Sequence, residues 1–179
     1  MNRVRVRVLT VLCSVALVVG SMVAAPAQAG PLWLTSDSSW TNPAQTSSSP
    51  RTRVRDLTFG HHQKFDRVVI RVLGTLPGGF ANYQRRFTHD GSGLPIPIGG
   101  RSGLQVSLTP AFAHTVGGDN IYVGPTIARP GLQTLKALAF AGDFEGHVTF
   151  AFALTHRAPY RIFTLESPRR IVIDFSHEG

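Results

Sequence analysis

Histidine and acidic side chains are the residues of this sequence with the most potential for chemistry. The chain has 7 His and 10 Asp or Glu among 179 residues. A zinc-type ion needs three or four such ligands converging on one point, often with two on one element at a fixed spacing. No H-x-H or H-E-x-x-H pattern is present. The sequence therefore predicts no metal cofactor, and a metal-dependent enzyme is the least favoured interpretation. Its candidate ligands are His61, His62, His89, Asp90, His114, Asp143, Glu145 and His147.

Motifs for nucleophilic, glycosidic and nucleotide chemistry are also missing. No G-x-S-x-G is present, and the glycine-rich segments around Ser92 and Ser102 are better explained as turns. A glycosidase needs two carboxyl groups in one cleft, one with a raised pKa. Asp56, Asp66 and Asp174 lie instead in strand-like segments rich in arginine, which favours cross-strand ion pairs. No G-x-G-x-x-G or Walker motif could hold a nucleotide. We therefore expect a protein that is not an enzyme and has no cofactor.

Arginine dominates the remaining charge. The 18 basic residues include 16 Arg, and the formal net charge is +8. The planar guanidinium group can bind a carboxylate or phosphate through two contacts. On the outer face of a sheet, such groups would be placed to meet an anionic polymer. The alternative is that each arginine is an ordinary solvated surface charge, and the sequence leaves both open. The candidate ligand-binding residues are Arg67, Arg71, Arg85 and Arg170.

The elements that would position these residues are strands. Hydrophobic residues make up 42% and charged residues 16%, which excludes a disordered chain, and the length suits one domain with a tail. Apolar and other residues alternate with a period of two, which is typical of strands with one buried and one solvated face. The clearest alternating runs are 67–72, 104–109, 148–154 and 170–175.

Weaker strand candidates fill the intervals between these runs. They are Thr52–Phe59, Phe80–Phe87, Leu135–Ala141 and Tyr160–Leu165, although Leu132–Ala141 also fits the spacing of a helix. Gly142–Gly146 is typical of a tight hairpin. About seven or eight short strands without a sustained helix predict an all-β fold, an antiparallel β-sandwich of two sheets or a small barrel.

The first 29 residues have the pattern of an export signal. Three arginines precede an apolar stretch that ends at Ala27-Gln28-Ala29, small residues at the positions a signal peptidase accepts. We expect a signal peptide over 1–29, although an uncleaved membrane anchor is an alternative. Cleavage would remove Cys13, the only cysteine, and leave a net charge of +5. The mature protein would then have no disulfide and no stable transmembrane span.

Residues 30–50 have the composition of a flexible linker. This segment is rich in Ser, Thr and Pro and offers little to bury. It also contains the only two tryptophans, Trp33 and Trp40. They could anchor a partner or a membrane surface, or they could fold back on the domain that we expect over 51–179.

Several short motifs resemble those of one family of exported bacterial proteins. The C-terminal stretch Ser167–Phe175 is similar to the P-x-R-[IL]-V-[IV]-D-[LF] ending of the AMIN domain, and Phe65–Ile70 resembles the F-D-R-V-V stretch of its AMIN-like relatives. The likeness extends from about Arg53 to Phe175. The same family has counterparts of Asp90–Gly93, Tyr122–Pro125 and Ala141–Gly146.

The resemblance implies a two-sheet β-sandwich in the extracytoplasmic envelope. AMIN domains accompany cell-wall amidases, secretins and transport proteins, which they target to peptidoglycan; the AMIN-like relatives supply no established ligand or catalytic residue. The sequence has no amidase domain, so we expect a secreted, non-enzymatic module that binds peptidoglycan or another anionic envelope component. The alternative is a protein–protein adaptor that docks an envelope protein. Nucleic acid is not an expected partner.

Overall fold

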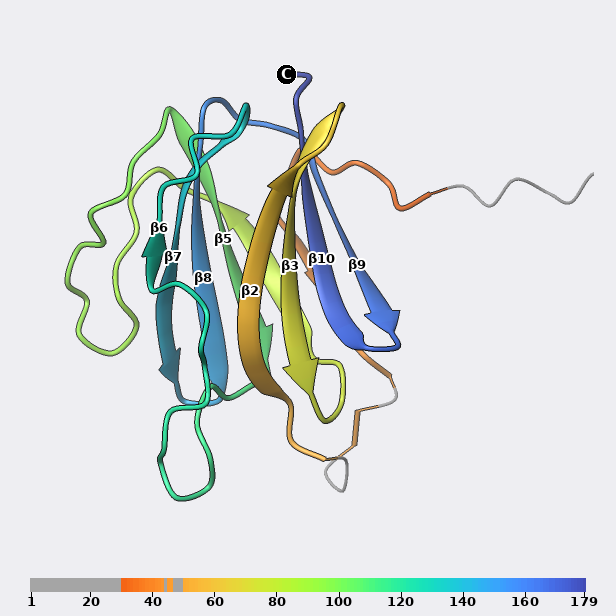
Figure 1. The fold of residues 1–179 in the computed structure, drawn as a ribbon, viewed down its shortest axis with the longest axis vertical. Coiled ribbons are helices and arrows are strands. Elements are labelled where there is room, and N and C mark those ends of the chain that lie inside the picture. Colours follow the sequence, from red (N-terminus) through yellow and green to blue (C-terminus); the bar gives the residue numbers. More distant parts are fainter. Residues whose placement is uncertain (1–29, 44, 47–49) are drawn as a thin grey trace, which may run out of the picture. The chain divides into compact units, whose positions relative to one another are not determined.

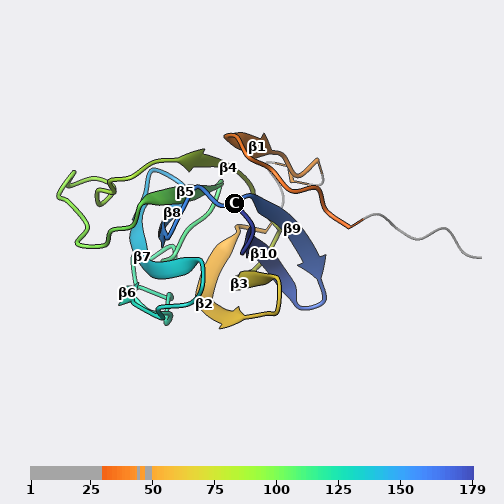
Figure 2. The same cartoon turned by 90° about the horizontal axis from the view of Figure 1, so that it is seen from above.

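The fold is an all-β arrangement of two antiparallel sheets. A computed structural model describes residues 30–43, 45–46 and 50–179, so the signal peptide expected over 1–29 lies outside the described residues. Figures 1 and 2 show one sheet on each side of the domain. The six-stranded sheet has the order β1-β4-β5-β8-β7-β6, and the four-stranded sheet has the order β2-β3-β10-β9. The strands are β1 (Ser38–Trp40), β2 (Arg53–His61), β3 (Phe65–Leu73), β4 (Gly78–Tyr83), β5 (Ser102–Thr109), β6 (Ile127–Ala128), β7 (Leu135–Phe144), β8 (His147–Leu154), β9 (Tyr160–Glu166) and β10 (Arg169–Ser176).

The described residues thus form ten strands and no helix, where the sequence predicts seven or eight strands. The eight longer strands correspond to the predicted ones, and the candidate at Leu135–Ala141 is a strand rather than a helix. The additional strands, β1 and β6, have 3 and 2 residues and lie at the two edges of the larger sheet. Segments this short carry no detectable alternation, and short edge strands limit pairing with other chains.

Both sheets contribute to one apolar core, as in a β-sandwich. The alternating positions predicted to point inward are buried on β3, β5, β8 and β10. Aromatic rings fill the centre, where Phe150 and Phe152 of one sheet pack near Phe175 of the other, with 5.4 Å between the ring centroids of Phe152 and Phe175. The inward-facing side chains are therefore used for packing, and residues that could bind a ligand lie at outward positions and in the loops.

The outward face of β8 differs from the prediction. Thr149, Ala151 and Ala153 are buried rather than solvated. A second apolar cluster covers this part of the sheet, because Phe87, Ile96 and Ile98 of the connection between β4 and β5 pack on the alanines of β7 and β8. The sequence pattern of β8 cannot predict that its outer face is buried, because the covering side chains belong to a loop distant in the sequence.

The segment 30–50 is also different from the predicted flexible linker, at least in its described part. Leu34 exchanges backbone hydrogen bonds with Tyr160, and β1 pairs with β4. Trp40 packs against the core and donates its indole N–H to the carbonyl of Pro77 at 3.3 Å. A Cβ atom on Gly79 would lie only 2.5 Å from the Trp40 ring, so the absence of a side chain at this position leaves room for the indole. Ordered packing in this structure therefore begins before residue 51.

The predicted hairpin between β7 and β8 is confirmed. Glu145 and Gly146 have φ values of 49° and 78°, as a two-residue type I′ connection requires. The turn places Phe144 directly opposite His147. Both side chains consequently lie at the same end of the larger sheet, where they border the hollow described below.

The covered outer face of β8 can be tested by enlarging a buried alanine. We expect Ala151→Leu to lower the free energy of unfolding by about 1–3 kcal/mol, because added methyl groups overpack a filled site. Thr58→Leu, at an exposed position of β2, is the control and should change it by less than about 0.5 kcal/mol. Urea unfolding followed by circular dichroism measures both. Equal stability of the two variants would contradict a covered face.

Candidate functional site

Two of the four candidate ligand-binding arginines are engaged by carboxylates of the protein itself. Arg67 donates two hydrogen bonds to Asp174, at 2.7 and 2.9 Å, and Arg161 donates a third at 2.7 Å. Asp174 is completely buried beneath the two guanidinium groups. Its hydrogen bonds and negative charge raise the pKa of Arg67. Arg71 forms an exposed ion pair with Asp56. These cross-strand pairs match the interpretation given above to Asp56 and Asp174.

The other two candidate arginines lie apart from each other. Arg170 is half-buried on β10 and donates to the backbone carbonyl of Pro168 at 3.1 Å. Arg85 is exposed just after β4, and the backbone bond from Gln84 to Gly103 places it beside the start of β5. The structure places Arg170 directly opposite Arg71 in the register of β10 and β3, on the sheet that also carries Arg67. Arg85 follows β4 of the other sheet, so the four residues do not form one anion site.

A different group of arginines is open to solvent. Arg85, Arg86 and Arg101 are exposed, flank the same end of β4 and β5, and form no ion pair with the described residues. Only Arg85 belongs to the predicted set. These three residues, the β4–β5 arginines, can still meet an external anion.

The candidate metal ligands named from the sequence do not converge on one point. His114 pairs with Asp143, whereas the Glu145 and His147 side chains make no bond to that carboxylate. His89 contacts the backbone carbonyl of Ala141 at 3.2 Å. His62 is exposed and stacks on Phe65, with 4.7 Å between the ring centroids. The predicted histidine and acid candidates therefore supply no three-ligand group within the described part of the chain.

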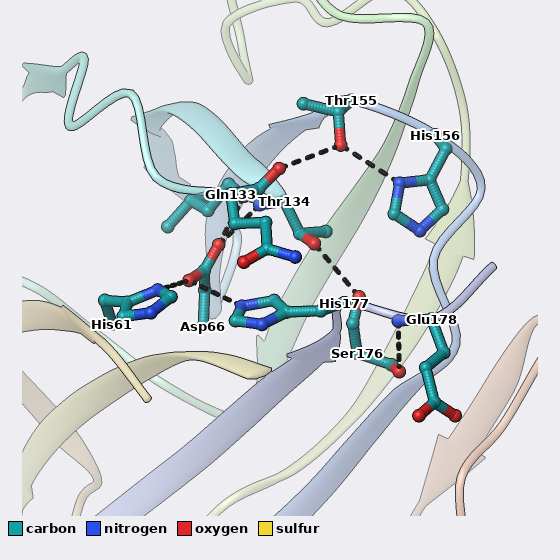
Figure 3. A network of polar contacts seen from close by, with 10 residues as sticks. His61, Asp66, Gln133, Thr134, Thr155, His156, Ser176, His177 and Glu178 are labelled. Atoms are coloured by element: carbon teal, nitrogen blue, oxygen red, sulfur yellow. Dashed lines mark hydrogen bonds and ion pairs between the residues drawn. The ribbon is translucent and has the colours of Figure 1, made fainter. Parts of the chain in front are cut away.

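The structure brings His61, one of the candidate ligands, together with His177 around the buried carboxylate of Asp66, a cluster that the sequence does not predict. His61, Asp66 and His177 come from the end of β2, the start of β3 and the residue after β10 (Figure 3). Burial acts to raise the pKa of Asp66, but hydrogen bonds from the backbone of Leu135 and Thr134 and from both histidines together lower it. His177 lies 111 residues from Asp66 in the sequence. No local spacing could have revealed the contact.

A hollow on the outer face of the six-stranded sheet is a candidate binding site. One register row crosses four strands, from Phe80 through Ser107 and Thr149 to Gly142. The small side chains in the middle of this row leave a space of about 300 Å³ between taller walls. Phe80 and His147 stand on one side, with ring centroids 6.1 Å apart. The hollow is defined by Phe80, Asp90, Ser107, Phe144, His147 and Thr149.

The opposite wall of the hollow comes from the loop before β5 and the β7–β8 turn. Asp90 donates its backbone N–H to Ala141, and a Cβ atom on Gly142 would lie 2.6 Å from that of Asp90. The glycine therefore lets the loop approach the sheet. The Phe144 ring, 50% exposed, lies close to the backbone of Gly91. On the floor, the Ser107 and Thr149 hydroxyl groups share a hydrogen bond of 3.0 Å.

The chemistry of this hollow suits an uncharged polar ligand with apolar faces. Aromatic rings offer flat surfaces for packing, and a few polar groups fix orientation. Asp90 and Glu145, both at the hollow, can accept hydrogen bonds from hydroxyl or amide groups but would repel a carboxylate. The β4–β5 arginines have the opposite preference. The domain thus presents two surfaces of different chemistry.

Comparison with known families identifies the chain. A model of the AMIN-like domain matches residues 52–177, which is more than half of the sequence. The chain belongs to the AMIN-like domain family. No curated protein and no solved structure matches it.

The family match covers nearly the whole two-sheet fold. The matched range begins just before β2 and ends at His177, so it includes the arginine pairs, the histidine cluster and the hollow of this AMIN-like domain. The strand β1 lies outside it, although β1 pairs with β4 inside it. Among the described residues of the domain, no helix has the length and apolar character needed to cross a bilayer.

The buried Asp174 makes a testable contribution to the stability of this AMIN-like domain. We expect Asp174→Asn to lower the free energy of unfolding by about 3–5 kcal/mol, because Arg67 and Arg161 would lose a buried countercharge. The matched control is Asp56→Asn in the exposed pair with Arg71, which should cost no more than about 1 kcal/mol. Chemical denaturation separates the two. A small effect of Asp174→Asn would show that the two arginines do not need this carboxylate.

Proposed function

We propose that this AMIN-like domain is an exported, non-catalytic module of the cell envelope that binds peptidoglycan. Two observations favour an envelope location: the family to which the chain belongs, and the signal-like pattern over residues 1–29. A binding rather than a catalytic role is consistent with the absence of sequence motifs for hydrolysis. The observation that carries the proposal is the hollow on the outer face of the six-stranded sheet.

Peptidoglycan consists of sugars that present hydroxyl and N-acetyl groups and flat apolar ring faces. Phe80 and Phe144 both border the hollow, so sugar rings bound there would find apolar surface on either side chain. Asp90 lies within reach to accept hydrogen bonds from sugar hydroxyl groups. The pattern of aromatic walls and a few polar groups is that of a small-molecule site.

The β4–β5 arginines would add a second, electrostatic contribution. Peptide stems of the cell wall carry carboxylates, and a guanidinium group can bind them through two contacts. This contribution replaces the originally expected set, because Arg67 and Arg71 already have carboxylate partners. Of the expected arginines, Arg85 remains the best-placed one.

The alternative function, an adaptor for an envelope protein, has less support. The adaptor interpretation used either a sheet edge or the Trp33 and Trp40 segment for docking. In that segment, Trp40 packs on the core. Trp33 is 40% exposed, and the Arg161 guanidinium lies 4.6 Å from its ring centroid. Trp40 therefore does not offer the free side chain that a docking anchor needs, and the exposed part of Trp33 shares its surroundings with Arg161.

Co-sedimentation with insoluble peptidoglycan tests the proposed function. We expect the purified protein to sediment with the polymer, and Phe144→Ala to weaken binding about tenfold, because loss of an aromatic anchor typically costs on the order of 1–2 kcal/mol. Phe59→Ala is the matched control, since Phe59 is a partly exposed phenylalanine on the other sheet. A protein that stays in the supernatant at low salt would refute peptidoglycan binding. Equal loss in both variants would refute the hollow as the site.

The arginine contribution has a separate readout. Replacing Arg85 and Arg101 by Gln should reduce the salt dependence of binding, because fewer charge contacts would remain to be screened. The Arg71→Gln variant, whose guanidinium already pairs with Asp56, should keep the original salt dependence. If the double variant binds with unchanged salt dependence, the β4–β5 arginines do not contact the polymer.

Pull-downs from envelope fractions, with and without muramidase digestion, distinguish the two functions. Peptidoglycan binding predicts that digestion abolishes retention of the protein. Capture of one specific envelope protein that survives digestion would favour the adaptor function instead.

A further inference from the structure

We propose that His61, Asp66 and His177 form a binding site for a zinc-type divalent cation. The site is independent of the proposed peptidoglycan binding, since it shares no residue with the hollow. One ligand atom from each residue lies within 4.8 Å of the other two. Two imidazole groups and one carboxylate are a donor set that zinc accepts.

Two of the three separations between donor atoms are close to those around a shared ion. His61 Nδ1 is 3.1 Å and His177 Nε2 is 3.0 Å from the same oxygen, Asp66 Oδ1. Ligand atoms about 2.0–2.1 Å from a tetrahedral zinc ion are about 3.3–3.4 Å apart. These two separations differ from those values by a few tenths of an ångström, whereas the two imidazole nitrogens, within 4.8 Å of each other, would have to move closer together.

Asp66 is held so that one oxygen stays available. Its other oxygen, Oδ2, accepts the backbone N–H groups of Thr134 and Leu135, at 2.7 and 2.9 Å. The residue is completely buried, and the two backbone bonds fix its orientation. Only Oδ1 therefore faces the histidines, as Figure 3 shows.

The backbone also fixes the other two ligands. His61 lies directly opposite Asp66 in the register of β2 and β3. The backbone N–H of His177 donates to Lys64 at 3.0 Å, and the carbonyl of the preceding Ser176 accepts from the Thr134 hydroxyl at 3.0 Å. Ligands on ordered elements keep a metal site geometrically defined.

Ion binding would require one ring to turn. The two imidazole rings are stacked, with planes 12° apart and centroids 5.0 Å apart, so their lone pairs cannot both point at one ion between them. The side chain of His177 is only 6% exposed, whereas that of His61 is 51% exposed and has room to rotate. The open side at His61 would leave a position for a further ligand from solvent.

A missing hydrogen bond behind one of the histidines lowers the affinity that we expect of this site for a metal ion. His177 Nδ1 is buried and has no hydrogen-bond partner among the described residues. A ligating histidine usually donates this second N–H to a carboxylate or carbonyl, which orients the ring. We therefore expect the ion to bind more weakly here than at a fully supported structural zinc site.

The experiment is titration of the purified full chain, without a polyhistidine tag, with Zn²⁺ against a chromogenic chelator. We expect one ion per chain, and at least about tenfold weaker binding in His61→Ala and in His177→Ala. The matched control is His62→Ala, whose exposed ring is next in sequence but lies outside the cluster. Circular dichroism establishes that each variant is folded.

Thermal unfolding gives an independent readout. A ligand that binds only the folded state raises the melting temperature, so Zn²⁺ should stabilise the original chain and the His62→Ala variant but not His61→Ala. His61 is the decisive position because its exposed ring contributes least to packing. Absence of stoichiometric binding, or equal binding by His61→Ala and the original chain, would show that the cluster is only a hydrogen-bonded structural link. Peptidoglycan sedimentation without added zinc tests the proposed function separately.

Discussion

The shared apolar core between the two sheets is the constraint on which the rest of this structure depends. Strand side chains alternate between two faces, so each buried apolar position assigns its neighbours to the outside. On β5 the buried Val106 leaves Gln105 and Ser107 on the outer face, and on β3 the buried Val68 leaves Arg67 there. All polar groups with functional potential consequently lie on outer faces, at strand ends or in loops.

Buried carboxylates organise those polar groups. Asp174 holds Arg67 and Arg161 against the outer face of the four-stranded sheet, and Asp66 links two backbone N–H groups at the start of β7 with two histidines. A carboxylate removed from water needs such partners, so the nearest cationic and donor groups bind to it and are not free to bind an external ligand. The basic charge left for an external ligand is therefore smaller than the composition implies.

The two surfaces considered for binding differ in origin. The hollow exists because small residues, Ser107, Thr149 and Gly142, follow Phe80 along one register row, and because a loop anchored at Asp90 closes its far side. The β4–β5 arginines lie together because β4 and β5 are antiparallel neighbours. The end of β4, followed by Arg85 and Arg86, therefore lies beside the start of β5, which Arg101 precedes. One surface is suited to neutral sugars and the other to carboxylates, and a peptidoglycan strand carries both.

The amino-acid sequence alone determined the all-β class, seven of the eight longer strands, the β7–β8 hairpin and the family resemblance, because each depends on residues close together in the chain. It left the segment of β7 open between strand and helix. The tertiary structure decided which outward groups meet. Only strand order and register bring His177 to Asp66, Arg161 to Asp174 and Phe80 into line with Thr149. The cover on β8 and the packing of Trp40 likewise come from segments distant in sequence. Alternation specifies the face on which a side chain lies, whereas its partner is set by the pairing of distant strands.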